Sequence, residues 1–206
     1  WRPDDLVGQL IDEFAHRDDL PAIRERRAKL AAGVDATTGE IRFLNRSGSY
    51  IWLETVSTPI LEEASGAVKG VQTSGRNVSE RKTAEELFRA LSALAPVGIF
   101  LTDADGGCAY VNARWEEIAG LTREAAAGPG WMTALHPEDR ERVLAEWGAA
   151  TQVGGEPSLD CRFQRPDGTV RHVVAAGVPL RDADGGVIGY VGSITDVTDL
   201  KDRQDE

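Results

Sequence analysis

The residue types that most often carry out chemistry are few in this chain, and their spacing matches no catalytic site. The histidines are His16, His136 and His172, and the cysteines are Cys108 and Cys161. The cysteines form no C-x-x-C pair and have no zinc-binding spacing, so we expect free thiols in a reducing compartment. H-E-x-x-H, G-x-S-x-G and P-loop patterns do not occur in the sequence. The sequence therefore predicts no catalytic residue and no metal site.

The histidines are better explained by local structure than by chemistry. His16 and His136 each precede a similar helix start, and a repeated capping position needs no catalytic role. His172 lies on a predicted strand, where a packing or surface role is favoured and contact with a ligand is the alternative. Only His172 is therefore kept as a candidate for ligand binding.

Aromatic side chains are the other candidates for ligand binding. Packing in the core is their more common role, and the lining of a small pocket is the alternative. The candidates for such a pocket are Phe100, Tyr110, Trp115, Trp131, His172 and Tyr190.

Charge and hydropathy limit the class of partner. The 206-residue chain has a formal net charge of −11 at pH 7. A negative protein repels phosphate backbones, so nucleic acid is not expected as a partner. The sequence has no stretch of about 18 consecutive apolar residues, so no membrane-spanning helix is predicted. Together with free thiols, these features predict a cytoplasmic protein.

Two segments resemble each other, which indicates an internal duplication. AVKGVQTSGRNVSERKT at 67–83 corresponds to GVIGYVGSITDVTDLKD at 186–202, with an offset of 119 residues. Further upstream the offset is 120 residues, so that Asp19 corresponds to Asp139. A period this long indicates a duplicated domain rather than a solenoid repeat.

The duplication sets the expected domain boundaries. The second copy begins near Ala95, so we expect the first copy to lack the N-terminal part of the domain. The expected segments are a truncated domain at 1–78, a helical linker at 79–95, a complete domain at 96–198 and the start of a further helix at 199–206.

The complete copy has the pattern of an antiparallel α+β domain. A cluster of short helices over 113–135 and a longer helix from His136 to about Ala150 lie between two groups of strands. The helices must cover one apolar face of the sheet, and a small interior cavity is a common result. The predicted strands, from their alternation and their turn residues, are 97–102, 108–111, 159–164, 170–180 and 187–195.

Three motifs identify a resemblance to a known family. The helix start HPEDRERV, the hairpin RPDGTVRHV and the ending GYVGSITDVTDLK resemble those of Per-Arnt-Sim (PAS) domains. RSGSYIWLE and GVQTSGRNVSERK resemble a second such domain, so the resemblance covers almost the whole chain. It implies two copies of a fold in which short helices flank a five-stranded antiparallel sheet. It also implies a sensory module joined in the same chain to an output domain, such as a histidine kinase or a diguanylate cyclase.

The same resemblance assigns a role to the end of each copy. The last strand of the family ends in Asp-hydrophobic-Thr and leads into a signalling helix, which here implies signal transmission through Asp196 and Thr198. Thr198 is also placed to cap that helix. The first copy departs from this pattern, because Asn77 and Ser79 replace the acid and the threonine. Neutral Asn77 can form hydrogen bonds but no ion pair, so weaker or different coupling is expected there.

The resemblance also bears on cofactors. A cysteinyl-flavin photoreceptor needs a cysteine in the region that here reads GPGWMTALHPED, and a haem domain needs a histidine in the region DRERVLAEWGAA. Both are missing, so these two cofactors are disfavoured. A small organic ligand and a redox flavin stay open as alternatives.

The helical linker has an apolar stripe with two interpretations. Leu87, Leu91 and Leu94 follow the 4-3 spacing of a coiled coil. The helix can cap its own domain or form the seam of a parallel homodimer, and too few heptads are present to decide. A constitutive dimerisation or spacing module without a ligand is therefore an alternative to the sensor.

Overall fold

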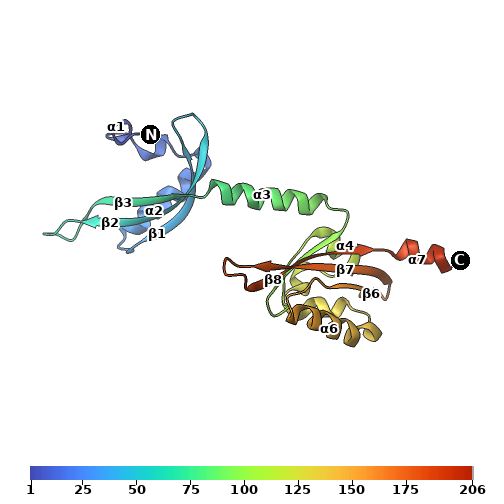
Figure 1. The fold of residues 1–206 in the computed structure, drawn as a ribbon. Helices are drawn as coiled ribbons and strands as arrows, with labels where there is room; N and C mark the ends of the chain where they lie inside the picture. Colours follow the sequence, from blue (N-terminus) through green and yellow to red (C-terminus); the bar gives the residue numbers. More distant parts are fainter. Residues whose placement is uncertain (206) are drawn as a thin grey trace. The chain divides into compact units, whose positions relative to one another are not determined.

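The computed structural model describes residues 1–205 (Figure 1). The chain divides into two compact units between Phe88 and Arg89. This boundary lies inside helix α3, Ser79–Leu94, which is the segment that the sequence assigns as a linker. Within the described residues, no helix is both long and apolar enough to cross a membrane. Each unit has its own sheet and its own apolar core.

The first unit is built on a three-stranded antiparallel sheet in the order β1-β2-β3. Its small core consists of Ala15, Ile23 and Ile41, with Leu20, Phe43 and Leu53 packed against them. The elements before α3 are α1 Pro3–Leu6, η1 Ile11–Glu13, η2 Arg17–Asp19, α2 Leu20–Ala31, β1 Thr37–Leu44, β2 Tyr50–Leu61 and β3 Val68–Asn77.

The second unit has a five-stranded antiparallel sheet, as the sequence predicts. The strand order is β5-β4-β8-β7-β6. The central strand β8 follows the others in sequence, so the core closes only when the C-terminal strand pairs with β4 and β7. The elements are β4 Gly98–Asp103, β5 Cys108–Val111, α4 Ala113–Ala119, α5 Arg123–Ala126, η3 Pro129–Ala134, α6 Pro137–Gln152, β6 Ser158–Gln164, β7 Val170–Arg181, β8 Val187–Asp196 and α7 Thr198–Asp205.

Local sequence explains where the helices of the second unit begin and end. The side chain of His136 accepts a hydrogen bond from the amide of Glu138, and Pro137 takes the first helical position of α6. His16 accepts from Asp18 in the same way in the first unit, so the capping role predicted for both histidines is confirmed. Helix α4 ends at Gly120, whose φ of 69° is the left-handed conformation that glycine adopts most easily.

Asn112 is buried in the second unit, where its side chain bonds to several elements. Its Oδ1 accepts from the amides of Trp115 at 2.9 Å and Ile99 at 2.8 Å. Its Nδ2 donates to the carbonyls of Ser92 at 2.8 Å and Val97 at 3.2 Å. One side chain, only 2% exposed, thus joins the end of α3, strand β4 and helix α4.

An acid–arginine clasp recurs in both units and supports the duplication. Asp139 Oδ2 accepts from the amide of Arg162 at 2.8 Å and from its Nε at 3.0 Å, and Oδ1 accepts from Nη2 at 2.7 Å. Asp19 and Arg42 make the same three bonds at 2.7, 3.1 and 2.7 Å. The clasp joins the start of the helical segment to the strand that follows it.

The clasp also makes stability depend on pH. The hydrogen bonds that Arg162 donates lower the pKa of Asp139 to about 2, against the opposing effect of burial. A carboxyl group whose pKa is lower in the folded state stabilises the fold above its unfolded pKa, and this contribution is lost as pH falls toward 2. A pKa lowered to this extent stabilises the folded state by on the order of 2 kcal/mol at neutral pH.

We expect Asp139→Asn to lower the unfolding free energy of the second unit by about 2 kcal/mol at pH 7. The difference from the unchanged protein should shrink between pH 4 and pH 2, because Asp139 is being protonated over that range. Chemical denaturation at several pH values measures both effects. The control is Asp160→Asn, which removes an exposed carboxylate of β6, the strand that carries Arg162. This variant should change the unfolding free energy little. A pH-independent loss for Asp139→Asn would contradict the clasp.

Candidate functional site

The second unit contains an internal cavity of about 50 Å³ between the inner face of its sheet and its helices. Strands β4, β7 and β8 supply Phe100, Ala175 and Ile194, and helix α6 supplies Val143 and Trp147. Val143 and Trp147 are four residues apart, so they project from the same face of α6. The cavity therefore lies inside the apolar core rather than on the surface.

Aromatic rings form much of the cavity wall. Trp115 and Phe163 meet edge to face, with ring centroids 6.0 Å apart, and Phe100 lies 5.7 Å from Trp147. Trp131 completes this set, and its Nε1 donates to the carbonyl of Gly106 at 3.1 Å. Because the one polar atom of Trp131 already has a partner, this side chain offers only apolar surface to the cavity.

Three of the six pocket candidates from the sequence line the cavity, namely Phe100, Trp115 and Trp131. Trp147 and Phe163 also line it and are not among those candidates. The signal for Trp147 is its spacing from Val143 along α6. The signal for Phe163 is strand alternation, because Cys161 and Phe163 are the two buried residues of β6.

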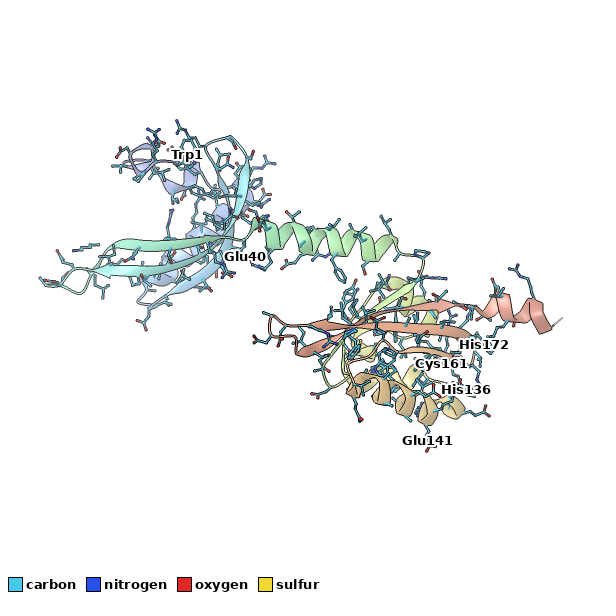
Figure 2. The ribbon with its side chains drawn as sticks, viewed as in Figure 1. Trp1, Glu40, His136, Glu141, Cys161 and His172 are labelled. Carbon is cyan, nitrogen blue, oxygen red and sulfur yellow. The ribbon has the colours of Figure 1, made fainter. Side chains whose placement is uncertain are left out.

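The other three candidates lie outside the cavity wall, which corrects their assignment. Tyr190 is buried, but its hydroxyl donates to the carbonyl of Thr151 at 3.0 Å at the end of α6. Tyr110 and Ser92 share a hydrogen bond of 3.0 Å between their hydroxyl groups. His172 (Figure 2) precedes buried Val173 on β7, so strand alternation directs its side chain to the opposite face of the sheet.

The two cysteines, distant in sequence, lie on the wall of the same cavity. Cys108 is on β5 and Cys161 on β6, the two edges of the sheet. Burial raises the pKa of Cys108, and it raises the pKa of Cys161 to about 11. Both thiols are therefore protonated at neutral pH, and a protonated thiol is a poor nucleophile and a poor metal ligand.

Thr102 is the remaining polar residue of the wall. Within the described part of the chain, its Oγ1 is buried and has no hydrogen-bond partner. A buried hydroxyl without a partner is uncommon and unfavourable.

A second feature of interest is the junction between β8 and α7. Asp196 Oδ1 accepts from the amide of Thr198 at 3.0 Å and from its hydroxyl at 2.6 Å. Thr198 Oγ1 in turn accepts from the amide of His172 at 3.0 Å, while the amide of Val197 donates to the carbonyl of His172 at 2.8 Å. Asp196 Oδ2 also lies 3.7 Å from Arg171 Nη1.

This geometry corrects one detail of the sequence interpretation. The sequence predicts Thr198 as the helix cap, but its hydroxyl oxygen binds the neighbouring strand instead. Asp196 supplies the acceptor for the first helical amide. Thr198 therefore fastens α7 to β7, and Asp196 orients Thr198.

The first unit has the same junction with neutral groups. Asn77 Oδ1 accepts from the amide of Ser79 at 2.9 Å, and Ser79 Oγ accepts from the amide of Trp52 at 2.9 Å. The ring of Trp52 also has Arg42 at 5.4 Å and Lys82 at 5.1 Å. Trp52 corresponds to His172, so the first junction adds cation–π contacts to the shared hydrogen bonds.

We expect iodoacetamide to label Cys108 and Cys161 slowly at pH 8 in the folded protein and rapidly after unfolding. Burial holds both thiols protonated and covered, and unfolding removes both effects. Mass spectrometry after timed labelling measures the rates. In Ser65→Cys the added thiol lies in an exposed turn and should be labelled quickly without unfolding. Fast labelling of Cys161 in the folded chain would contradict its burial.

Comparisons with known proteins agree with this geometry. A sequence model of the PAS fold matches residues 1–74 and 109–194. The chain is 30% identical over 198 residues to the uncharacterized protein y4lL of Sinorhizobium fredii, an alignment that covers 93% of this chain and 24% of that protein. It is 26% identical over 203 residues to the peroxide stress-activated histidine kinase mak1 of Schizosaccharomyces pombe, covering 87% of this chain and 12% of the kinase.

A solved structure provides a further comparison. The N-terminal domain of a diguanylate cyclase with PAS/PAC sensor from Marinobacter aquaeolei is 20% identical, with a TM-score of 0.48. The alignment covers 51% of this chain and 98% of that domain. The chain spans a quarter or less of the length of the two curated relatives. Because the PAS sequence model matches most of the chain, in one segment within each unit, the chain belongs to the PAS fold family and carries the fold in two copies.

Proposed function

We propose that the second unit is a sensor that couples a ligand in its cavity, or a partner on its sheet, to the position of α7. The observation that carries the proposal is the place of Ile194. This residue lines the cavity and precedes Asp196 by two positions on the same strand. A ligand that displaces Ile194 therefore acts on the strand whose end fixes the start of the helix.

The neighbouring strand gives a second connection. Ala175 of β7 lines the cavity, and His172 of the same strand holds Val197 and Thr198 through its backbone. Both strands that bind the helix start are thus strands of the cavity wall. The proposal implies an equilibrium between two positions of α7. A ligand can shift that equilibrium only by the difference between its affinities for the two positions. The proposal therefore requires that the contacts of the ligand with Ala175 of β7 and Ile194 of β8 differ between the two positions of α7.

The proposed output is a domain in the same polypeptide, of the histidine kinase or diguanylate cyclase class. The relative mak1 is named a histidine kinase, and the domain from Marinobacter aquaeolei belongs to a diguanylate cyclase. Neutral, buried thiols are compatible with a reducing, cytoplasmic setting. The output class is tested by fusing a histidine kinase domain or a diguanylate cyclase domain after α7 and measuring which of the two becomes active.

The junction is tested by Asp196→Ala combined with Thr198→Ala. Their hydrogen bonds, partly exposed, are worth about 1 kcal/mol each, so the domain should stay folded. The start of α7 should lose its attachment, because the amide of His172 and the first helical amide lose their acceptors. We expect hydrogen exchange to accelerate far more in residues 199–205 than in residues 187–195.

The matched control is Asp202→Ala, which removes an exposed carboxylate of α7 away from the junction. Its exchange rates should resemble those of the unchanged protein. Global unfolding of the double variant would show that the junction is a folding element. Unchanged exchange in 199–205 would show that other contacts hold the helix.

A dimerisation role for α3 is the second candidate function. Leu87, Leu91 and Leu94 are 58%, 60% and 83% exposed in the single chain. Large apolar side chains with coiled-coil spacing are favoured at helix–helix contacts. The proposed occupant of this stripe is the α3 helix of a second copy of the chain.

Leu91→Glu tests the dimer, because it places a charge at the centre of the apolar stripe. We expect the variant to be monomeric where the unchanged chain is a dimer, since burying an unpaired carboxylate costs several kcal/mol. Light scattering coupled to size-exclusion chromatography gives the mass. Val153→Glu, at a residue that is 82% exposed at the C-terminal end of α6, should leave the mass unchanged. Equal masses for the unchanged chain and Leu91→Glu would exclude the dimer seam.

A further inference from the structure

We infer that the cavity of the second unit binds a small, uncharged molecule with one hydrogen-bonding group and an apolar body, such as a short-chain alcohol. This inference rests on the proposed sensor function and specifies its ligand. It follows from the chemistry of the wall, the position of one hydroxyl and the volume available.

The wall selects against charge. Apart from the Thr102 hydroxyl and the thiols of Cys108 and Cys161, its side chains are hydrocarbon or aromatic, and none carries a charge. A carboxylate or ammonium group inside such a wall would be desolvated without a partner, which is strongly unfavourable. The body of the ligand must therefore be apolar.

Thr102 provides the hydrogen-bonding position. It is 9% exposed, and strand alternation places it on the same face of β4 as Phe100. Within the described part of the chain its Oγ1 has no partner, while the Cys108 thiol already points to the carbonyl of Tyr110 at 3.7 Å. Of the residues that line the cavity, Thr102 is the one whose buried side-chain oxygen has no partner within the described residues, and a ligand hydroxyl would satisfy it.

Water fits this site poorly. A buried water usually makes about three hydrogen bonds, and this wall offers one hydroxyl and two weakly polar thiols. A molecule that needs one hydrogen bond and presents hydrocarbon elsewhere matches the wall better.

The volume limits the size of the ligand. A cavity of about 150 Å³ holds a benzene molecule, and this cavity has about 50 Å³. A ligand of roughly three or four non-hydrogen atoms fits on that scale. A tricyclic flavin or a haem would require displacement of wall side chains such as Trp147 and Phe163.

The test is a titration of the 206-residue chain with propan-1-ol, propionate and xenon, followed by amide NMR spectra. We expect saturable shifts with propan-1-ol that centre on Thr102, Ala175 and Ile194. Propionate at neutral pH should give no such shifts. Propionate binding as tightly as propan-1-ol, or no saturable response to propan-1-ol at these residues, would overturn the inference.

Two variants distinguish the contribution of the Thr102 hydroxyl to binding from the contribution of the cavity volume. Thr102→Val keeps the shape of the side chain, so it should weaken propan-1-ol binding about tenfold and leave xenon binding unchanged. It should also raise the thermal midpoint without ligand, because an unpaired hydroxyl is removed. Unchanged affinity for propan-1-ol would overturn the role of Thr102 and with it the inference.

Ala175→Leu fills the cavity and should abolish binding of both propan-1-ol and xenon. The matched control is Ala176→Leu, at the exposed next position of the same strand, which should bind both as before. Loss of binding in Ala176→Leu as well would overturn the cavity as the site. If Ala175→Leu does not fold, Thr102→Val still decides the question.

Failure of the ligand class and failure of the sensor function give different results. If propan-1-ol does not bind but the Asp196 and Thr198 double variant still frees α7, the ligand inference fails and the junction stands. If propan-1-ol binds in the cavity and hydrogen exchange in residues 199–205 does not change, the ligand inference stands. Coupling between the cavity and the helix then fails.

Discussion

The attachment of α7 to the sheet depends on one residue, His172, whose backbone amide and carbonyl need hydrogen-bond partners where the sheet ends. The pairing of β7 with β8 stops at Val173 and Asp196, which leaves the amide and carbonyl of His172 beyond the ladder. Partly buried backbone groups need partners, and the start of α7 supplies both, through the Thr198 side chain and the Val197 amide. The helix therefore begins as a continuation of the sheet. The same constraint at Trp52 joins α3 to the first unit.

The acid–arginine clasp attaches helix α6 to the sheet, as the His172 backbone attaches α7. It fixes the start of α6 against β6 through Asp139 and Arg162, so the direction of the helix is set at its first turn. The turns that follow carry Val143 and Trp147 to the cavity. Asp139 and Arg162 do not line the cavity, but by fixing the start of α6 they determine which face of the helix lines it. Its recurrence in the first unit shows that both copies use one scheme.

The cavity and the junction share strands, and the proposed coupling between them depends on this arrangement. In a closely packed sheet, a side chain cannot move without moving its neighbours. Ile194 and Ala175 are such neighbours of the residues that hold α7. The neutral thiols and the single hydroxyl of the wall fit recognition of a ligand better than reaction with it. Binding energy, rather than chemistry, would then drive the change in α7.

The sequence by itself determined the elements whose signals are local. Alternation and turn residues predict the strands, His136 and Pro137 predict the start of α6, and Asp196 marks the end of the last strand. Only the tertiary structure decided which residues meet. Cys108 and Cys161 share a cavity, Trp147 joins Phe100, and Thr198 binds β7, because strand order and helix rotation set these contacts. Pairing between strands far apart in the sequence leaves no trace in local periodicity, so neither the complete set of wall residues nor the binding of Thr198 to β7 could be assigned from neighbouring residues.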